Sequence, residues 1–154
     1  MNRKYDFGVV IGRFQPFHLA HQDLIKYSLS LAEKVIVILG SARSAPDVKN
    51  PFTPQMREEI IRACFPNDAD RLVFRAVRDY PYNDHVWTAD IQNLVGQIVD
   101  EDEKENEKVA VVGFFKDRTS YYLNLFPQWN FEEFYCSDKK FLSINATKIR
   151  EQFF

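Results

Sequence analysis

The chain has 154 residues, 45% of them hydrophobic and 27% charged, which is typical of one folded domain and excludes a disordered segment. Its 20 basic and 22 acidic residues give a formal net charge of −2, which disfavours a protein that coats a nucleic-acid backbone. The two cysteines lie far apart and no apolar run could cross a bilayer, which excludes a disulfide scaffold, a four-cysteine zinc site and a membrane partner. We expect one cytoplasmic domain over residues 1–154.

Buried apolar runs alternate with segments of helical spacing along the chain. In chain order we predict a strand over 5–11, a helix over 19–32, a strand over 34–39, a helix over 53–63, a strand over 72–77, a helix over 84–99, a strand over 108–112, a helix over 118–126, a strand over 131–135 and a helix over 146–152. Thr53 before Pro54 predicts an N-cap and a first-turn proline. Strands joined by helix-length crossovers indicate a parallel α/β sheet of about five strands with helices on both faces.

Three glycines stand at the ends of predicted strands, namely Gly12, Gly40 and Gly113. Ligands of parallel sheets bind beyond the carboxyl ends of the strands, so we expect the site at this edge. No two glycines have the spacing of a dinucleotide-binding fingerprint, and the chain contains no phosphate-binding loop motif of the G-x-x-x-x-G-K-[ST] type. A bound nucleotide would therefore need another phosphate-binding device.

The first candidate device is the segment from Gly12 to His21, GRFQPFHLAH, between the first strand and the first helix. Gly12 allows a sharp turn, and Arg13 supplies a planar cation suited to phosphate. His18 and His21 share one face of a first helical turn, which presents backbone N–H groups and the positive end of the helix dipole. Together these groups predict an anion site. The alternatives are a pair of histidines that only cap the helix, or, with weaker support, a zinc site completed by His85.

GRFQPFHLAH closely resembles the H-x-G-H signature of the nucleotidylyltransferase superfamily, and more narrowly the GRFQPFH form of nicotinamide-mononucleotide adenylyltransferases. Ala20 departs from the signature glycine. The resemblance implies a Rossmann-like fold and catalytic roles for His18 and His21. It also implies that ATP and phosphate are bound by Gly12, Arg13, Phe14 and Gln15.

A second resemblance lies near the C-terminus, where INATKIR over 144–150 is similar to the superfamily's I-S-x-T-x-x-R signature. Asn145 stands where the family has serine. The resemblance implies catalytic roles for Thr147 and Arg150. Further phosphate or ATP contacts are implied for Asn145, Lys148, Gly113, Lys116 and Asp117, the last three in a segment similar to the bifunctional bacterial enzymes. An ordinary capped helix is the alternative for this heptad taken alone.

The middle of the chain resembles the nicotinamide-nucleotide branch at NPFT over 50–53, at Arg57 and at YNDHVW over 82–87. The resemblance implies that the nicotinamide nucleotide is bound by Asn50, Phe52, Arg57, Asn83 and Trp87. A cationic pyridinium ring stacks well on the indole of Trp87, although core packing is an equally good explanation of that residue from spacing alone.

The resemblance implies transfer of the adenylyl group of ATP to nicotinamide mononucleotide, which gives NAD and pyrophosphate by direct in-line attack. Mg²⁺ would be bound mainly through the ATP phosphates, with no metal ligands from the chain. Two alternatives stay open: transfer to another phosphate acceptor such as phosphopantetheine, and a non-catalytic nicotinamide-nucleotide sensor. In the bifunctional enzymes a Nudix hydrolase domain follows, and its box is absent from this sequence. The presence of that domain in a longer protein, a homo-oligomer and the choice between nicotinamide and nicotinate stay open.

Overall fold

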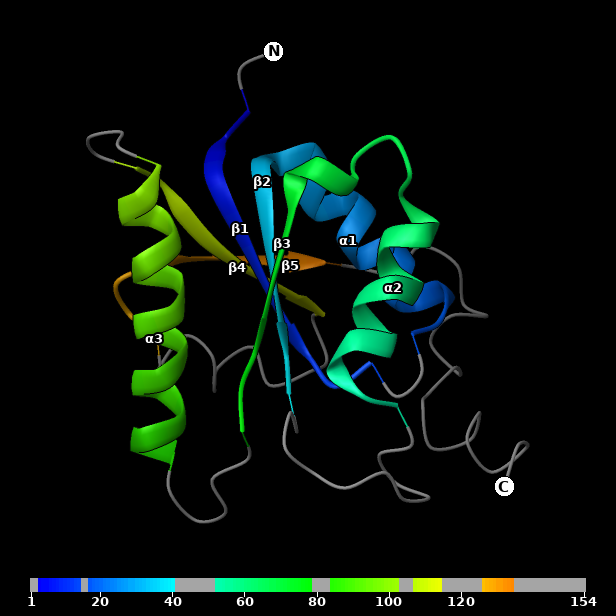
Figure 1. Ribbon diagram of the computed structural model, residues 1–154. Helices are drawn as coiled ribbons and strands as arrows, with labels where there is room; N and C mark the ends of the chain where they lie inside the picture. The colour runs from blue at the N-terminus through cyan, green and yellow to red at the C-terminus, as the bar shows by residue number, and fades with distance from the viewer. Residues whose placement is uncertain are drawn as a thin grey trace.

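A parallel sheet forms the centre of the molecule in the computed structural model, which describes residues 3–14, 17–40, 52–78, 84–102, 107–114 and 126–134. Its five strands run in the order β3-β2-β1-β4-β5 (Figure 1). The strands are β1 (Tyr5–Gly12), β2 (Ala32–Leu39), β3 (Leu72–Ala76), β4 (Val109–Phe114) and β5 (Asn130–Phe134). Every neighbouring pair is parallel, so the carboxyl ends of all five strands lie at one edge of the sheet.

The strand order reverses beside β1, and this reversal positions the site. From β1 the chain moves outward to β2 and then to β3, and it returns to the other side of β1 to form β4. Val9 of β1 pairs with Ile36 of β2 on one side and with Val111 of β4 on the other. In open parallel sheets, ligands bind outside the carboxyl ends of the strands at such a reversal. In this chain that place is the end of β1, at Gly12.

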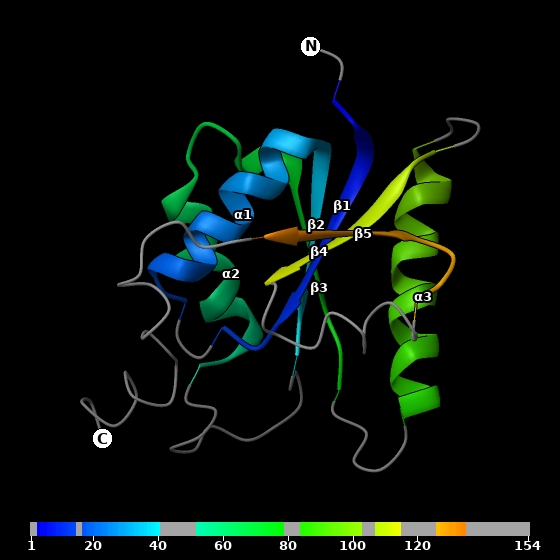
Figure 2. The same cartoon turned by 180° about the vertical axis from the view of Figure 1, so that it is seen from behind.

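Helices cover both faces of the sheet (Figures 1 and 2). Helices α1 (Leu19–Leu31) and α2 (Pro54–Cys64) lie on one face, and α3 (Asp84–Glu101) lies on the other. A short 3-10 turn, η1 (Ala69–Arg71), leads into β3. None of the described helices has the length and apolar character needed to cross a membrane.

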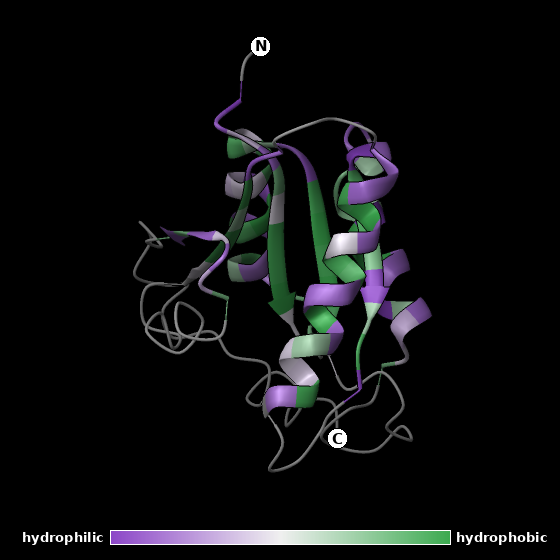
Figure 3. Ribbon diagram, turned by 90° about the vertical axis from the view of Figure 1, so that its left-hand side faces the viewer, coloured by the Kyte–Doolittle hydropathy of each residue, from purple (hydrophilic) through white to green (hydrophobic). Residues whose placement is uncertain are grey.

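Each face of the sheet carries its own apolar core, because β-branched residues of the strands point alternately to the two sides. The core under α1 and α2 includes Val10, Ile25 and Ile61. The core under α3 includes Val9 and Ile91. Figure 3 shows the central strands as hydrophobic along most of their length, whereas α3 mixes hydrophobic and hydrophilic residues, as expected for a helix with one buried side.

The predicted fold class is confirmed, as are all five strands and the first three helices. Thr53 caps α2 as predicted, because its side chain accepts a hydrogen bond from the backbone N–H of Met56 over 3.1 Å. Most boundaries differ by at most one residue, and three differ by two: β2 begins at Ala32, directly after α1, β4 ends at Phe114, and α3 continues into the acidic stretch as far as Glu101. The predicted helix over 146–152 lies outside the described residues, as does the one over 118–126 apart from Phe126.

Candidate active site

The connection between β1 and α1 turns sharply at the carboxyl edge of the sheet. Gly12 ends β1, and its carbonyl accepts a hydrogen bond from the N–H of Gly40 over 2.9 Å. Phe14 is only 2% exposed and has a φ of 53°, in the left-handed region that side chains other than glycine rarely adopt. Its ring lies where a Cβ on Gly12 would sit, with Cζ 2.9 Å from that position. A side chain at position 12 would therefore force the buried Phe14 ring to shift.

Two imidazoles stack at the N-terminus of α1. His18 is the N-cap and His21 is the third helical residue, and their ring centroids are 3.7 Å apart. The backbone N–H of His18 donates to Nδ1 of His21 over 3.4 Å. A neutral imidazole carries one proton, so acceptance at Nδ1 leaves the proton of His21 on Nε2. The Phe14 ring meets the His21 ring edge-on at 4.8 Å.

Both histidines are neutral at pH 7. Burial lowers the pKa of His18 from its ordinary value of 6.5 to about 4. Burial, and to a lesser extent the neighbouring His18, lowers the pKa of His21 to about 3. The pair therefore offers N–H donors rather than fixed positive charge. A polyanion beside the rings would favour their charged forms and raise both pKa values.

Arg57 lies beneath this turn and contacts its backbone. Its side chain is 1% exposed, and Nη1 donates to the carbonyl of Arg13 over 2.7 Å and to that of Gly40 over 2.6 Å. Nε donates to the carbonyl of Thr53 over 3.3 Å. From the resemblance, Arg57 is expected to bind the nicotinamide nucleotide, and this stays a prediction. In the structure, Nη1 and Nε donate to backbone carbonyls of three segments.

Trp87 stands in the first turn of α3, on the opposite face of the sheet from the histidines. It is half-buried and packs against the core under α3. Its ring centroid lies 6.1 Å from that of Phe126, which stacks on Trp129 at 5.1 Å. Core packing therefore accounts for part of the indole surface, and the rest is partly exposed.

The other predicted site residues divide into those that the structure describes and those that lie outside its described part. Arg13 is exposed, Phe52 is half-buried just before α2, and Gly113 lies in β4, where a Cβ would come within 3.4 Å of the Phe131 ring. The predicted site residues outside the described part of the chain are Gln15, Asn50, Asn83, Lys116, Asp117, Asn145, Thr147, Lys148 and Arg150.

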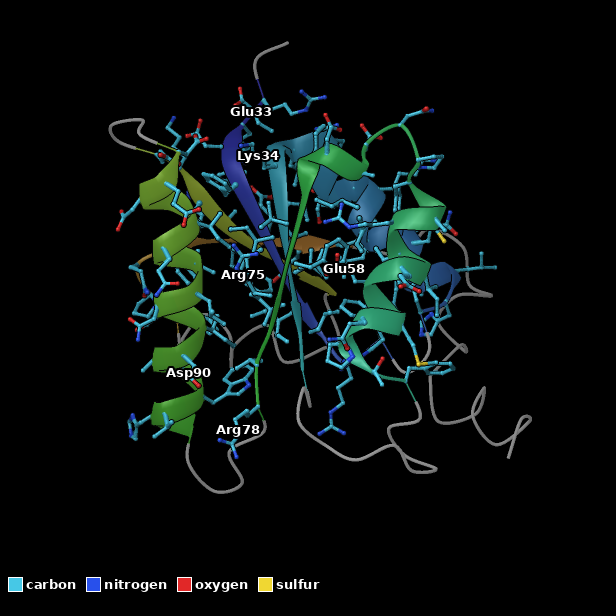
Figure 4. All side chains as sticks on the ribbon, in the orientation of Figure 1. Glu33, Lys34, Glu58, Arg75, Arg78 and Asp90 are labelled. Atoms are coloured by element: carbon cyan, nitrogen blue, oxygen red, sulfur yellow. The ribbon has the colours of Figure 1, made fainter. Side chains whose placement is uncertain are left out.

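Two further residues lie at the same edge: Gly40, which is expected only to mark the end of a strand there, and Arg78, for which no role is predicted. The carbonyl of Gly40 accepts from Arg57, and its N–H donates to Gly12, so Gly40 joins the ends of β1 and β2. Arg78 is an exposed cation that follows β3, and Figure 4 shows it beyond the end of that strand, on the side of the molecule where α3 begins. In both cases the available signal was the position directly after a predicted strand.

The donor chemistry of this edge suits phosphate better than a bare metal ion. Across the described ranges, no three His, Cys, Asp or Glu side chains come together in a group that could hold a metal. The turn instead presents imidazole N–H groups, the N-terminus of α1 and the Arg13 side chain. Helix N-termini and guanidinium groups bind phosphate oxygens well.

Comparison with known proteins gives a consistent result. Residues 9–152 match the cytidylyltransferase-like family model. The chain is 39% identical over 152 residues to a nicotinamide/nicotinic acid mononucleotide adenylyltransferase of Acinetobacter baylyi, which covers 98% of this chain and 77% of the relative. It is 30% identical over 143 residues to a nicotinamide-nucleotide adenylyltransferase of Sulfurisphaera tokodaii, covering 91% of this chain and 74% of the relative.

A solved structure agrees with these sequence matches. A bifunctional NMN adenylyltransferase/ADP ribose pyrophosphatase from Francisella tularensis, complexed with AMP and a manganese ion, superimposes with a TM-score of 0.83 at 33% identity. The match covers 97% of this chain but 41% of the Francisella chain. This chain therefore spans about two fifths of the length of that bifunctional protein.

Proposed function

Because this chain belongs to the cytidylyltransferase-like family, we propose that it is a nucleotidyltransferase that joins the adenylyl group of ATP to nicotinamide mononucleotide. The products would be NAD and pyrophosphate. The choice of acceptor rests on the Acinetobacter and Sulfurisphaera relatives, whose names specify a nicotinamide nucleotide.

The observation that carries the proposal is the stacked pair of neutral histidines at the N-terminus of α1. The pair follows β1, whose end lies at the reversal of the strand order. A nucleoside triphosphate needs hydrogen-bond donors for several phosphate oxygens. This turn supplies imidazole N–H groups together with the positive end of a helix dipole. The burial that keeps His18 and His21 uncharged also strengthens their hydrogen bonds, because the surroundings have a low dielectric constant.

The proposed reaction needs no enzyme nucleophile. An oxygen of the nicotinamide mononucleotide phosphate forms a bond to the α-phosphorus of ATP, and the bond from that phosphorus to the bridging oxygen breaks. The electron pair leaves with pyrophosphate, so the negative charge is spread over oxygens that need hydrogen-bond donors. We assign that work to His18, His21, Thr147 and Arg150, with phosphate also held by Arg13. Positioning two substrates in line can lower a barrier by about 7–11 kcal/mol in favourable cases.

A divalent cation fits this site as a companion of ATP. Phosphate oxygens are ligands that Mg²⁺ prefers, and it usually keeps several waters. The Francisella structure is described with AMP and a manganese ion, which supports use of a divalent metal by that protein. Mg²⁺ would neutralise part of the triphosphate charge, while residues of this chain position the oxygens. We propose Mg²⁺ as the metal, held mainly through ATP phosphates.

The remaining assignments extend the same proposal. We assign the nicotinamide nucleotide to the side of the carboxyl edge where α3 begins, with its ring against the exposed part of Trp87 and with contacts from Phe52, Asn50 and Asn83. Residues 1–154 would act as one adenylyltransferase domain in the cytoplasm.

A coupled assay tests the proposal directly. The purified chain is incubated with ATP or CTP and with nicotinamide mononucleotide, nicotinate mononucleotide or phosphopantetheine, and pyrophosphate release and dinucleotide formation are measured together. The proposal predicts pyrophosphate and NAD in equal amounts from ATP and nicotinamide mononucleotide. Turnover only with phosphopantetheine would identify that compound as the acceptor instead of nicotinamide mononucleotide. Turnover only with CTP would identify CTP as the nucleotide donor instead of ATP. Binding of both substrates without product would indicate a sensor.

A further inference from the structure

We propose that Arg57 is a positioning residue for the phosphate-binding turn and makes no contact with substrate. The inference rests on the proposed function, because it concerns the turn to which that function assigns ATP. The resemblance had placed this arginine among the groups that bind the nicotinamide nucleotide. Its contacts in the structure give it a different task.

The guanidinium joins three segments that meet at the carboxyl edge of the sheet. Nη1 donates to the carbonyl of Arg13, just after β1, and to the carbonyl of Gly40, just after β2. Nε donates to the carbonyl of Thr53, the N-cap of α2. These distances are 2.7, 2.6 and 3.3 Å, and the side chain is 1% exposed. A buried charge is costly unless hydrogen bonds compensate it, and the three carbonyls do so for Nη1 and Nε.

The contact with the Arg13 carbonyl also fixes the direction of the next backbone donor, the N–H of Phe14. In a planar trans peptide, the C=O and the N–H of one unit point in opposite directions. Fixing the Arg13 carbonyl toward Arg57 therefore directs the N–H of Phe14 away from the guanidinium. Phe14 has a φ of 53°, a strained conformation that persists only where its surroundings impose it. Arg57 supplies that constraint from below, and the Phe14 ring then sets the orientation of His21, which it meets at 4.8 Å.

Arg71 provides a matched comparison at the opposite edge of the sheet. It donates to the backbone carbonyls of Leu29, Ala32 and Glu33, where α1 ends and β2 begins. Like Arg57, it ties backbone segments together, but it lies far along the strands from the histidine pair. An arginine with a purely structural role, as we expect for Arg71, should affect stability and leave the kinetics of the folded molecule unchanged.

The test compares Arg57→Lys with Arg71→Lys in the ATP-dependent assay and in thermal unfolding. A lysine keeps the charge but has a single nitrogen, so it cannot reproduce the planar arrangement in which Nε bonds the Thr53 carbonyl while Nη1 bonds those of Arg13 and Gly40. We expect Arg57→Lys to lower kcat/KM for ATP by about tenfold to a hundredfold per folded molecule, since small displacements of reacting groups have effects of this size. Arg71→Lys should lower the unfolding temperature and leave kcat and KM of the folded molecule within about twofold of the wild-type values.

A second variant keeps the proposal testable if the lysine variant folds poorly. Arg57→Ala leaves a cavity shaped for a guanidinium, and millimolar methylguanidinium should restore activity, whereas methylammonium should not. The proposal is overturned if Arg57→Lys retains wild-type kcat and KM, or if its loss of activity equals the fraction of protein that is unfolded. It is also overturned if methylguanidinium restores no more activity to Arg57→Ala than methylammonium does.

A failure of the proposed function can be distinguished from a failure of the positioning role proposed for Arg57. If the wild-type chain forms no dinucleotide, amide hydrogen exchange still tests Arg57. The Phe14 amide should exchange at least about tenfold faster in Arg57→Lys than in the wild type or in Arg71→Lys, because the turn is then no longer fixed. Equal exchange in all three proteins would reject the positioning role independently of any activity.

Discussion

The proposed chemistry assigns donor roles to two imidazoles that burial keeps uncharged. Two imidazolium rings with centroids 3.7 Å apart would repel each other, and burial adds a cost for each charge. Neutral rings avoid both penalties before ATP arrives, and each still carries one N–H. The same burial leaves them poised to gain positive character as phosphate charge approaches.

Replacing His21 with alanine should lower kcat by about a hundredfold to a thousandfold, the usual effect of removing one donor to developing charge. The fold should survive, because the ring is supported at the edge of the core rather than inside it. Steady-state kinetics and circular dichroism measure the two effects. Unchanged turnover would remove His21 from the proposed chemistry.

Replacing Gly12 with alanine should destabilise the chain by about 1–3 kcal/mol, because the new Cβ would lie 2.9 Å from the Phe14 ring. The matched control is Gly96→Ala in α3, where a Cβ meets nothing within 4 Å. That change should stabilise the protein by up to about 1 kcal/mol, since alanine favours helix over glycine. Urea unfolding compares the two variants. A Gly12→Ala protein as stable as the wild type would show that the Phe14 ring does not need this space.

At the scale of elements, the strands and first three helices follow from local patterns. Runs such as Lys34–Leu39 are too apolar and β-branched to be anything but buried strands, and Thr53 with Pro54 marks a helix start without reference to the rest of the chain. The junction at Ala32 could not be predicted. It depends on Arg71, whose donations to carbonyls at the end of α1 allow helix and strand to meet without a loop.

The candidate site was predictable from the sequence only in part. The histidine pair and Gly12 follow from helical spacing and from the need for a turn after a buried strand. The task of Arg57 could not be read from the sequence, because an arginine in a first helical turn is ordinarily exposed, and its burial depends on carbonyls from β1 and β2. The contribution of Phe14 likewise depends on a positive φ that no sequence rule predicts for phenylalanine.

The start of α3 should determine affinity for the acceptor. Trp87→Ala is expected to raise KM for nicotinamide mononucleotide by about tenfold while changing KM for ATP much less, because indole stacking on a cationic ring contributes on the order of 1–2 kcal/mol. Trp129→Ala is the control, since Trp129 stacks on the same Phe126 from the segment before β5. It should lower stability without separating the two KM values. Equal shifts in both KM values for Trp87→Ala would make Trp87 structural.

At the scale of the whole molecule, the histidine pair makes unfolding sensitive to acid. Unfolded histidines take up protons below about pH 6.5, whereas the folded pair resists protonation until about pH 4 for His18 and about pH 3 for His21. The unfolded state therefore binds more protons in this window, and the free energy of unfolding falls as the pH is lowered from about 6.5 to about 4.

Each buried imidazole can contribute at most about 1.4 kcal/mol per pH unit to this slope. The double variant His18→Asn with His21→Asn should show a flatter dependence in urea unfolding over the same pH range. His85→Asn, at an exposed position on α3, is the control. A slope that is the same in the double variant and the wild type would show that the pair does not titrate as its burial requires.

The parallel topology is what brings these parts together. The reversal of strand order beside β1 leaves one edge at which the histidine turn, the end of β2 and the start of α3 all lie. In the proposed function, two anionic substrates meet at this edge. The proposed transfer then needs only one displacement at phosphorus, with no intermediate attached to the chain.

The stereochemical course at phosphorus tests that claim most directly. One diastereomer of adenosine 5′-O-(1-thiotriphosphate) is supplied with nicotinamide mononucleotide, and the configuration of the thio-dinucleotide is determined by phosphorus NMR. A single in-line displacement predicts inversion at the α-phosphorus. Retention would require two displacements through an enzyme-bound adenylyl group, and it would contradict the direct transfer that we propose.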